Sequence, residues 1–343
     1  MSPTTVIKQE AIPYLEYPSP NRNNPSRKQC LIFFITGNPG LAAYYTPFLT
    51  HLRQLLSELE STPTSNHAYH IYCRNLLGFS DADHSPPFGT PLPNQQSTTT
   101  LPFTLEDQIQ SITTTLHSLS SPTPFHSIIL IGHSVGAYIA TEIFHRTHCT
   151  HLSPISTLPL TSGILLFPTL THIALSPSGR KLNLIRTTPL LNTWTHILAK
   201  SIINLLPTPL LQTILSKFLS QPPHAASATL SFLQSQDGIW QAIHMGKDEM
   251  ATITEEKWSD ELWQLSRSSN SPSQSSKFYF YFAKKDHWVA DEVRDAFIER
   301  RKTDARARTK AVICEEDIPH AFCIHHSETV AEKVKVWIQE ITG

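Results

Sequence analysis

The pentapeptide Gly-His-Ser-Val-Gly at residues 132–136 has the G-x-S-x-G pattern, which can present a serine as a nucleophile. An apolar run, residues 127–131, precedes it, and a helix-compatible stretch, residues 137–144, follows it. Such a turn needs this order of strand and helix, because its strained backbone holds the hydroxyl above the end of the strand. We therefore predict that Ser134 is a nucleophile. The alternative is a glycine-rich turn without a catalytic role.

A serine hydroxyl is a weak nucleophile at neutral pH, so it needs a base that a carboxylate orients. With this kind of turn the chain order is Ser, then Asp or Glu, then His. His320 is the predicted base, because it follows the last expected strand, at the end of the sheet where α/β proteins assemble their sites. His325 and His326 are alternatives that are expected to belong to the entry of the next helix.

Asp286 is the predicted acid, because it follows the apolar and aromatic run at residues 277–283. The alternative for this residue is a turn or helix-capping aspartate. Asp317 lies too close to His320 in the sequence to come from a separate strand end. The three predicted catalytic residues thus follow three different strands.

A negative charge that develops on a carbonyl oxygen needs backbone N–H donors. The amide of Val135, directly after the nucleophile, is expected to be one donor. The amide of Asn38 is expected to be the other, because it lies in the Gly-Asn-Pro-Gly loop at residues 37–40, after the first core strand. The alternative for this loop is an ordinary glycine-proline turn.

The elements that position these residues are strands that alternate with helices, which predicts an α/β fold with a mostly parallel sheet. Strands are expected at residues 31–36, 70–73, 127–131, 163–167, 277–283 and 311–314, and helices at 47–59, 105–119 and 327–341. Ser327 is the expected N-cap of the last helix. Residues 86–102 and 268–276 are polar and are expected to form loops.

A long stretch without clear strand patterns interrupts the alternation, so we divide the chain into three parts. Residues 1–167 and 277–343 are expected to form the core, and residues 168–276 a helical cap. Within the cap, residues 194–219 predict two short apolar helices hinged at Pro207 and Pro209.

The same apolar hairpin is expected to dip into a lipid monolayer. Its two lysines, Lys200 and Lys217, would then reach the headgroups. The alternative is a hairpin that packs over the sheet as the underside of a cap.

The composition excludes some classes of partner and cofactor. The 343 residues carry a formal net charge of −1, with 27 basic and 28 acidic side chains, which gives no reason to expect nucleic acid. Five scattered cysteines and the absence of an apparent signal peptide predict a reducing, intracellular setting. No phosphate-binding loop is present. His145, His148, Cys149 and His151 could bind a metal, but no second cluster completes a site, so no metal or cofactor is expected.

Several segments together resemble the lipid droplet-associated hydrolase family. They are T-G-N-P-G at 36–40 with Y-Y at 44–45 and P-F at 47–48, G-H-S-V-G-A-Y at 132–138, L-L-F-P-T at 165–169, S-P-S-G-R at 176–180, M-G at 245–246, E-M at 249–250, D-H-W at 286–288 and I-P-H-A-F at 318–322. Around the acid the family has Y-G-x-x-D-x-W-x-P, and this chain has F-A-K-K-D-H-W-V-A at 282–290.

The resemblance implies an α/β-hydrolase fold with a catalytic triad of Ser134, Asp286 and His320. It also implies an ester or sterol-ester hydrolase at lipid droplets. We therefore expect a serine ester hydrolase that acts on sterol esters or acylglycerols at the cytoplasmic face of the droplet, with the endoplasmic reticulum as a second location. A droplet surface or adaptor protein with a vestigial site is the alternative from a different class. A peptidase or thioesterase is a further alternative, whereas an epoxide hydrolase would need Asp in place of Ser134.

Overall fold

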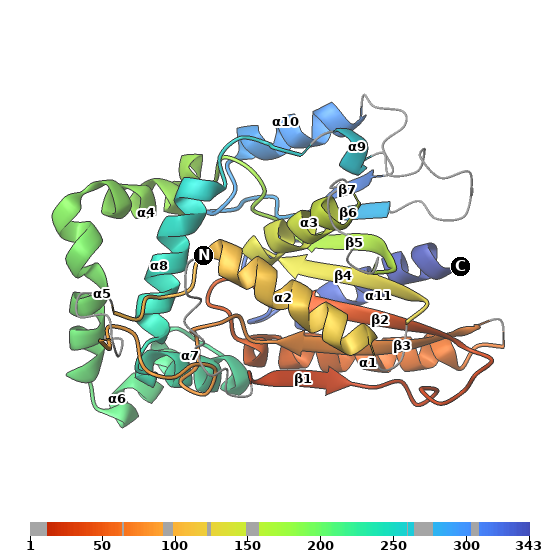
Figure 1. Ribbon diagram of the computed structural model, residues 1–343, viewed down its shortest axis with the longest axis horizontal. Helices are drawn as coiled ribbons and strands as arrows, with labels where there is room; N and C mark the ends of the chain where they lie inside the picture. The colour runs from red at the N-terminus through yellow and green to blue at the C-terminus, as the bar shows by residue number, and fades with distance from the viewer. Residues whose placement is uncertain are drawn as a thin grey trace.

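The computed structural model describes residues 12–63, 65–91, 99–121, 125–148, 158–258, 260–263, 277–302 and 309–343. Within these residues the chain forms a seven-stranded sheet with helices on both faces and further helices beyond one end (Figure 1). The strands are β1 (Tyr14–Tyr17), β2 (Lys28–Ile35), β3 (His67–Arg74), β4 (Ser127–His133), β5 (Leu160–Leu166), β6 (Lys277–Phe282) and β7 (Thr309–Ile313). Their order in the sheet is β1-β3-β2-β4-β5-β6-β7.

Apart from β1, which pairs antiparallel with β3, the neighbouring strands run parallel. The central strands β2 and β4 are buried over most of their length, as expected for parallel strands that helices cover on both faces. The parallel arrangement brings the ends of β2, β4, β6 and β7 to one edge of the sheet, so the loops that follow them lie together. This is the mostly parallel α/β architecture that the strand and helix patterns predict, and it agrees with the α/β-hydrolase fold that the family resemblance implies.

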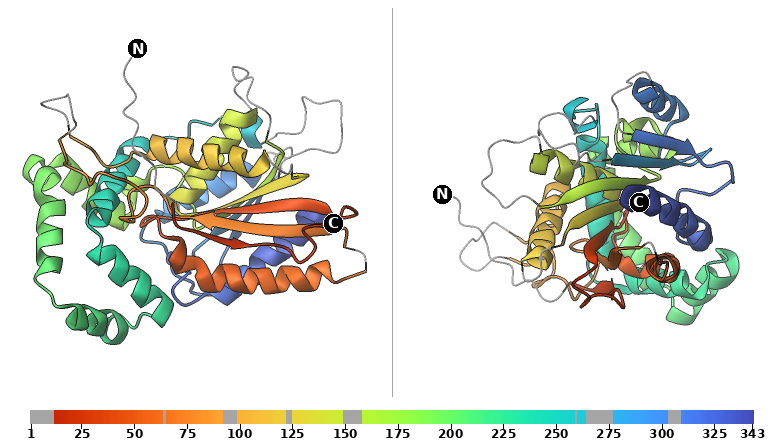
Figure 2. Two further views of the ribbon diagram at one scale, coloured as in Figure 1. Left: turned by 60° about the horizontal axis from the view of Figure 1, so that its bottom comes forward. Right: turned by 90° about the vertical axis from the view of Figure 1, so that its right-hand side faces the viewer.

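Two pairs of helices cover the two faces of the sheet (Figure 2). The helices α1 (Thr46–Glu60) and α11 (Ser327–Thr342) pack side by side on one face, and α2 (Leu105–Ser120) and α3 (Val135–His148) lie on the other. The remaining helical segments are η1 (Ala42–Tyr45), η2 (Ile173–Leu175), α4 (Pro177–Thr187), α5 (Pro189–Asn204), α6 (Thr208–Thr213), η3 (Ile214–Phe218), α7 (Pro223–Gln234), α8 (Gly238–Thr252), α9 (Asp260–Trp263) and α10 (Asp291–Lys302).

The aromatic strand β6 shows how the sequence pattern selects these two faces. Phenylalanine and tyrosine alternate along it, so one residue type points to each face. Phe280 packs on Phe297 of α10 with 5.1 Å between the ring centroids, whereas Tyr279 packs on Trp337 of α11 at 5.3 Å. Burial on both faces fixes the position of β6 and therefore of the loop that follows it.

The six strands and four helices predicted around the catalytic residues are confirmed, with ends that differ by a few residues. The sequence pattern does not predict β1, because this short edge strand is only half-buried and its residues alternate in exposure. The expected N-cap at Ser327 is wrong. His326 is the N-cap residue, and Ser327 begins α11 and donates a hydrogen bond to the Cys323 carbonyl instead. The predicted loop at 268–276 lies outside the described residues, as do residues 92–98 of the other loop.

Between β5 and β6 the described residues form helices and no strands, and the helices α4 to α8 lie beyond the carboxyl ends of the parallel strands (Figure 1). The boundaries of a separate cap at residues 168 and 276 stay a prediction. Among the described residues, no single helix is long and apolar enough to cross a membrane. However, α5 and the segment Thr208–Phe218 are together long and apolar enough, although the two are bent by 99° relative to each other.

The break between the two apolar helices is confirmed at Pro207, whereas Pro209 lies in the first turn of α6. The expectation that Lys200 reaches lipid headgroups is wrong. The Lys200 ammonium donates hydrogen bonds to the carbonyls of Leu233 and Ser235, at 3.1 and 2.6 Å, and so binds the exposed carbonyl end of α7. Lys217 is exposed.

Candidate active site

Ser134 lies in the sharp turn that its glycine neighbours predict. Its φ of 56° is in the left-handed region, which residues other than glycine rarely adopt. A Cβ atom on Gly132 would lie 2.3 Å from the carbonyl oxygen of Gly136, and a Cβ atom on Gly136 would lie 2.3 Å from that of Ile35. Glycine at both positions therefore allows α3 to approach β4 and β2 closely enough to form the turn.

Ser134, His320 and Asp286 form one chain of hydrogen bonds. His320 Nε2 lies 2.9 Å from Ser134 Oγ, and His320 Nδ1 lies 2.7 Å from Asp286 Oδ2. The other carboxylate oxygen, Oδ1, accepts a hydrogen bond from the Trp288 amide at 2.8 Å. The structure thus brings together the three residues that the sequence predicts, from the loops after β4, β6 and β7.

The surroundings of Asp286 favour its ionised form. Burial tends to raise the pKa of this carboxyl, but the hydrogen bonds from His320 and the Trp288 amide outweigh burial and hold the pKa below its usual value of 3.8. An ionised Asp286 keeps the proton of His320 on Nδ1, which leaves Nε2 free to accept a proton from the serine. Of the alternatives from the sequence, Asp317 is exposed and His326 precedes α11.

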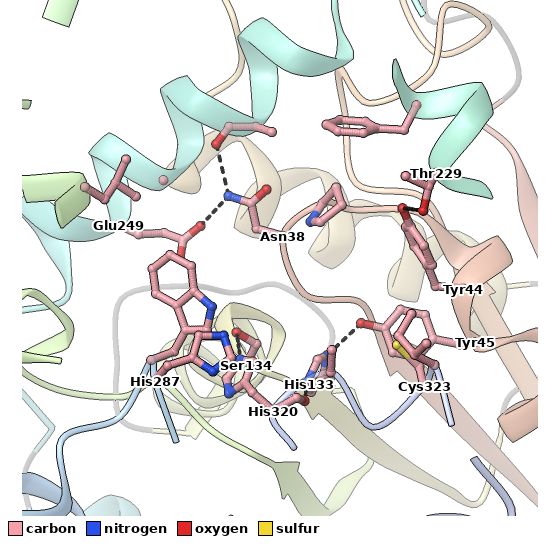
Figure 3. Close-up of a pocket in the computed structure, with 18 of the residues that line it drawn as sticks. Asn38, Tyr44, Tyr45, His133, Ser134, Thr229, Glu249, His287, His320 and Cys323 are labelled. Atoms are coloured by element: carbon pink, nitrogen blue, oxygen red, sulfur yellow. Dashed lines mark hydrogen bonds between the residues drawn. The ribbon is translucent and has the colours of Figure 1, made fainter. Parts of the chain in front are cut away.

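The histidine of the pentapeptide, His133, joins three parts of the site. Its Nε2 donates a hydrogen bond to the backbone carbonyl of His320 at 2.9 Å, so its Nδ1 accepts the hydroxyl proton of Tyr45 at 2.6 Å. The Tyr45 hydroxyl oxygen in turn accepts the backbone N–H of Gly37 at 3.1 Å. This network links the loop after β2, the nucleophile turn and the loop that carries the base (Figure 3).

The loop at residues 37–40 lies beside the nucleophile. A Cβ atom on Gly37 would lie 3.2 Å from the Ser134 Cβ atom. The side-chain amide of Asn38 points to α8, where it donates hydrogen bonds to the Ala242 carbonyl at 3.1 Å and to Glu249 Oε1 at 3.0 Å. The side-chain amide is thus engaged by α8, and the role of the Asn38 backbone N–H as an oxyanion donor stays a prediction. The amide of Val135 lies in the first turn of α3, where backbone N–H groups have no partner within the helix.

A cavity of about 510 Å³ adjoins Ser134, and Figure 3 shows most of its lining side chains. His320, Asn38 and Tyr44 line it, together with apolar side chains from η2, α4, α7, α8 and the loop after β7. Among the described lining residues there is one carboxyl group, on Glu249, and no lysine or arginine. A mostly apolar cavity without cationic groups suits an uncharged ligand with a large hydrocarbon part.

Tyr45, His133 and Glu249 have no predicted role in the sequence, although all three line this cavity. All three lie within the segments that carry the family resemblance, which was the available signal for them. Their contacts join loops and helices that are far apart in the chain, so spacing alone could not assign them. The assignment required the three-dimensional structure.

The four residues considered as metal ligands lie only partly within the described residues. His145 and His148 lie on α3, whereas Cys149 and His151 lie outside the described residues. Among the residues that are described, no three His, Cys, Asp or Glu side chains form a group that could hold a metal ion.

Comparison with solved structures identifies the fold. A peroxisomal α/β-hydrolase from Saccharomyces cerevisiae superposes with a TM-score of 0.60 at 12% sequence identity, over 100% of this chain and 86% of that chain. An esterase from Exiguobacterium antarcticum superposes with a TM-score of 0.53 at 12% identity, over 97% of this chain and 98% of the esterase. At these identities the similarity establishes the α/β-hydrolase fold alone.

Comparison of sequences is more specific. The lipid droplet-associated hydrolase of Pongo abelii is 27% identical over 322 residues, which cover 92% of this chain and 86% of the relative. The human lipid droplet-associated hydrolase is 26% identical over 317 residues, which cover 90% of this chain and 84% of the relative. The family profile described as lipid-droplet associated hydrolase matches residues 28–323. The chain therefore belongs to the lipid droplet-associated hydrolase family, and its fold and family are those of a hydrolase.

Proposed function

We propose that this hydrolase is a serine ester hydrolase that acts on lipid esters, either sterol esters or acylglycerols. The observation that carries the proposal is the chain of hydrogen bonds from Ser134 through His320 to Asp286, at the wall of an apolar cavity. A serine, a base and an orienting carboxylate in this order are the groups that acyl transfer requires. The cavity beside them accommodates a hydrocarbon chain.

The mechanism follows from the positions of these groups. Ser134 Oγ attacks the ester carbonyl carbon while its proton passes to His320 Nε2, and the amides of Val135 and Asn38 stabilise the oxyanion. His320 then gives the proton to the leaving alcohol, and the acyl group stays on Ser134. A water molecule that His320 deprotonates attacks the acyl-enzyme and releases the acid. Every step uses side chains and backbone amides of this chain.

Replacement of the nucleophile tests the proposal. We expect Ser134→Ala to lower the hydrolysis of a p-nitrophenyl acyl ester by at least about 10³-fold, because the acyl-enzyme cannot form. A fluorophosphonate probe should label the wild-type protein at Ser134 and leave the variant unlabelled. Ser118→Ala, on the exposed side of α2, is the matched control. Full activity of the Ser134 variant, or labelling of another residue, would contradict the mechanism.

We place the protein at the cytoplasmic surface of lipid droplets, with the endoplasmic reticulum as a second location. Two observations support this location. The relatives carry the name lipid droplet-associated hydrolase. The helix α5 has no buried residue, although most of its large side chains are apolar. A bent pair of apolar helices can enter the monolayer over neutral lipid and return, since the monolayer has no second aqueous side.

The exposed helices also favour a second candidate, a droplet surface or adaptor protein whose site is vestigial. The two candidates share the location and differ in chemistry. Purified protein that coats droplets but reacts with no serine-directed probe would favour the adaptor. Labelling at Ser134 together with acid release from a lipid ester would favour the enzyme.

A further inference from the structure

The helix α8 presents a single carboxyl group to the cavity that contains Ser134. Glu249 is 4% exposed, and its Oε1 atom accepts a hydrogen bond from the side-chain amide of Asn38 at 3.0 Å. Among the described residues, no other acidic side chain and no lysine or arginine lines this cavity. Figure 3 shows Glu249 on the α8 side of the cavity, beside Asn38. The carboxyl group therefore has a polar neighbour but no cation to pair with.

A carboxyl group in these surroundings is neutral at pH 7. Burial raises the pKa of Glu249 to about 8, the Asn38 hydrogen bond lowers it by a smaller amount, and the nearby charge of Asp248 raises it further. The Oε1 atom accepts the Asn38 N–H, so the proton of the neutral acid belongs on Oε2. Among the described residues none forms a hydrogen bond with Oε2. A hydroxyl donor without a protein acceptor thus lies in a wall of the cavity.

This donor has no partner in a simple ester. In the proposed mechanism, the carbonyl oxygen of the ester accepts hydrogen bonds from the amides of Val135 and Asn38, and the leaving alkoxide oxygen receives its proton from His320. Hydrocarbon alone would cover the Glu249 hydroxyl without accepting its hydrogen bond, which is unfavourable for a buried donor. A ligand with a further oxygen, on the part that does not react, would satisfy it.

We propose that Glu249 is a specificity-determining residue, whose Oε2 hydroxyl donates a hydrogen bond to a second oxygen of the substrate. The substrates it selects are acylglycerols, which carry a free hydroxyl or a second ester group. Sterol esters and simple alkyl esters have no such oxygen and are the poorer substrates. This inference rests on the proposed function and decides between the two classes of lipid ester that the proposal leaves open.

A pair of esters with the same carbon skeleton tests the inference. We expect the wild-type protein to hydrolyse 1-oleoylglycerol with a higher kcat/KM than propyl oleate, which lacks the two hydroxyl groups. Glu249→Met should reduce the ratio of the two kcat/KM values by at least about tenfold, because the donor is lost. Glu249→Gln should keep most of the preference, because its amide oxygen still accepts from Asn38 and its NH₂ group still donates.

The ratio of the two kcat/KM values distinguishes two roles for Glu249. One is selection of the substrate, and the other is positioning of the loop at residues 37–40 through Asn38. Loss of the contact with Asn38 alone would lower kcat/KM for both esters equally, because every ester uses the same oxyanion donors. An equal loss on both esters in Glu249→Met would overturn the inference. An absence of preference in the wild type, or a Glu249→Gln variant that behaves like Glu249→Met, would overturn it as well.

A binding measurement on a catalytically inactive variant tests the role of Glu249 separately from the proposed ester hydrolysis. The probes are the two corresponding ethers, 1-O-oleylglycerol and oleyl propyl ether, bound to Ser134→Ala with and without Glu249→Met. If the wild-type protein hydrolyses neither ester but the glycerol ether still binds more tightly in a way that depends on Glu249, the inference is supported and the proposed hydrolysis is refuted. Hydrolysis without that preference would refute the inference alone.

Discussion

At the scale of single residues, two neighbouring histidines of the site have different tasks because their partners differ. His133 is buried, and burial, followed by the nearby charge of His320, lowers its pKa to about 3, so its ring is neutral and acts as a fixed link. His320 instead lies between a hydroxyl and a carboxylate, which is the arrangement of a group that gains and loses a proton. In the proposed mechanism, the neutral His133 ring therefore positions His320 without competing for its proton.

Tyr45→Phe tests this link. The variant keeps the aromatic ring against Phe34 but removes the hydroxyl that connects His133 to Gly37. We expect kcat for a p-nitrophenyl ester to fall about tenfold while KM changes little, because a misplaced oxyanion donor weakens the transition state more than the ground state. Steady-state kinetics and the rate of fluorophosphonate labelling at Ser134 measure this.

The control for this prediction is Tyr69→Phe, which removes a hydroxyl that bonds to Thr342 far from the nucleophile. If both variants lose the same fraction of kcat, the effect is a general loss of stability. A Tyr45→Phe protein with wild-type kcat would contradict the positioning role.

How much of the site could be predicted from the sequence depends on the kind of contact. Ser134, Asp286 and His320 each follow a strand, and strand ends can be located from apolar runs and chain order. Their juxtaposition in the structure agrees with that reasoning. The roles of His133 and Glu249 depend on packing between distant segments, which no local pattern encodes.

At the scale of elements, a buried cluster fastens α8 to the loop after β3. His84 lies between two aspartates, with Nδ1 2.7 Å from Asp83 and Nε2 2.9 Å from Asp237, the N-cap residue of α8. Asp237 also accepts the backbone N–H of Phe88 at 2.8 Å. Burial lowers the pKa of His84, but the hydrogen bonds to Asp237 and Asp83 outweigh burial and raise it to about 9.

This cluster predicts a dependence of stability on pH. The pKa of His84 is higher in the folded protein than the ordinary value of 6.5, so its stabilising contribution is complete below pH 6.5 and is lost as the pH rises through about 9. At 1.36 kcal/mol per pKa unit, the contribution is about 3 kcal/mol. Urea unfolding of the wild type and of His84→Gln between pH 6 and 9.5 measures it.

The quantity to compare is the difference in the free energy of unfolding between the two proteins, because other groups titrate in the same range in both. This difference should shrink between pH 6.5 and 9. A difference that stays constant with pH would show that His84 contributes through packing against Phe88 rather than through its charge.

The elements also show where prediction from sequence ends. The six parallel strands are apolar over most of their length, so the expected and observed ranges overlap throughout. The edge strand β1 and the N-cap of α11 do not follow from the pattern. β1 is short and half exposed, and the side chain of Ser327 bonds backwards to Cys323 rather than forwards to the helix amides.

At the scale of the whole molecule, the apolar surface is uneven. The sheet and its covering helices enclose most large apolar side chains, but α5 and the segment after it leave many exposed, including Leu205 at 81% and Phe218 at 78%. Contiguous exposed apolar surface on a folded protein marks a contact with another apolar phase. The proposed phase is the droplet monolayer.

Replacement of exposed side chains tests that contact without disturbing the core. We expect a variant with serine at Leu190, Ile202, Leu205 and Phe218 to lose most of its binding to droplets, because each large apolar side chain that enters lipid contributes roughly 1.5–3 kcal/mol. Its stability should change by less than about 0.5 kcal/mol per site, because these side chains are exposed in the folded protein. Leu211 is left in place, because it is buried.

The matched control replaces exposed apolar residues elsewhere, Tyr14, Leu101 and Val336, with serine. Fluorescence microscopy of tagged proteins on isolated droplets compares the variants. If the four-serine variant decorates droplets as strongly as the wild type, the bent helices are the outer surface of a cap and another region binds lipid.

The helix α8 contacts α5 on its outer side and holds Asn38 and Glu249 on its inner side. Adsorption of the protein to the droplet would act on α8 through α5, and a lipid in the cavity would act on α8 through Glu249. Two binding equilibria that act on the same helix can be linked. Linkage of this kind is reciprocal. If the two are positively linked, a lipid in the cavity strengthens adsorption of the protein to the droplet by the same free energy with which the droplet favours entry of the lipid, and release of the product weakens adsorption again.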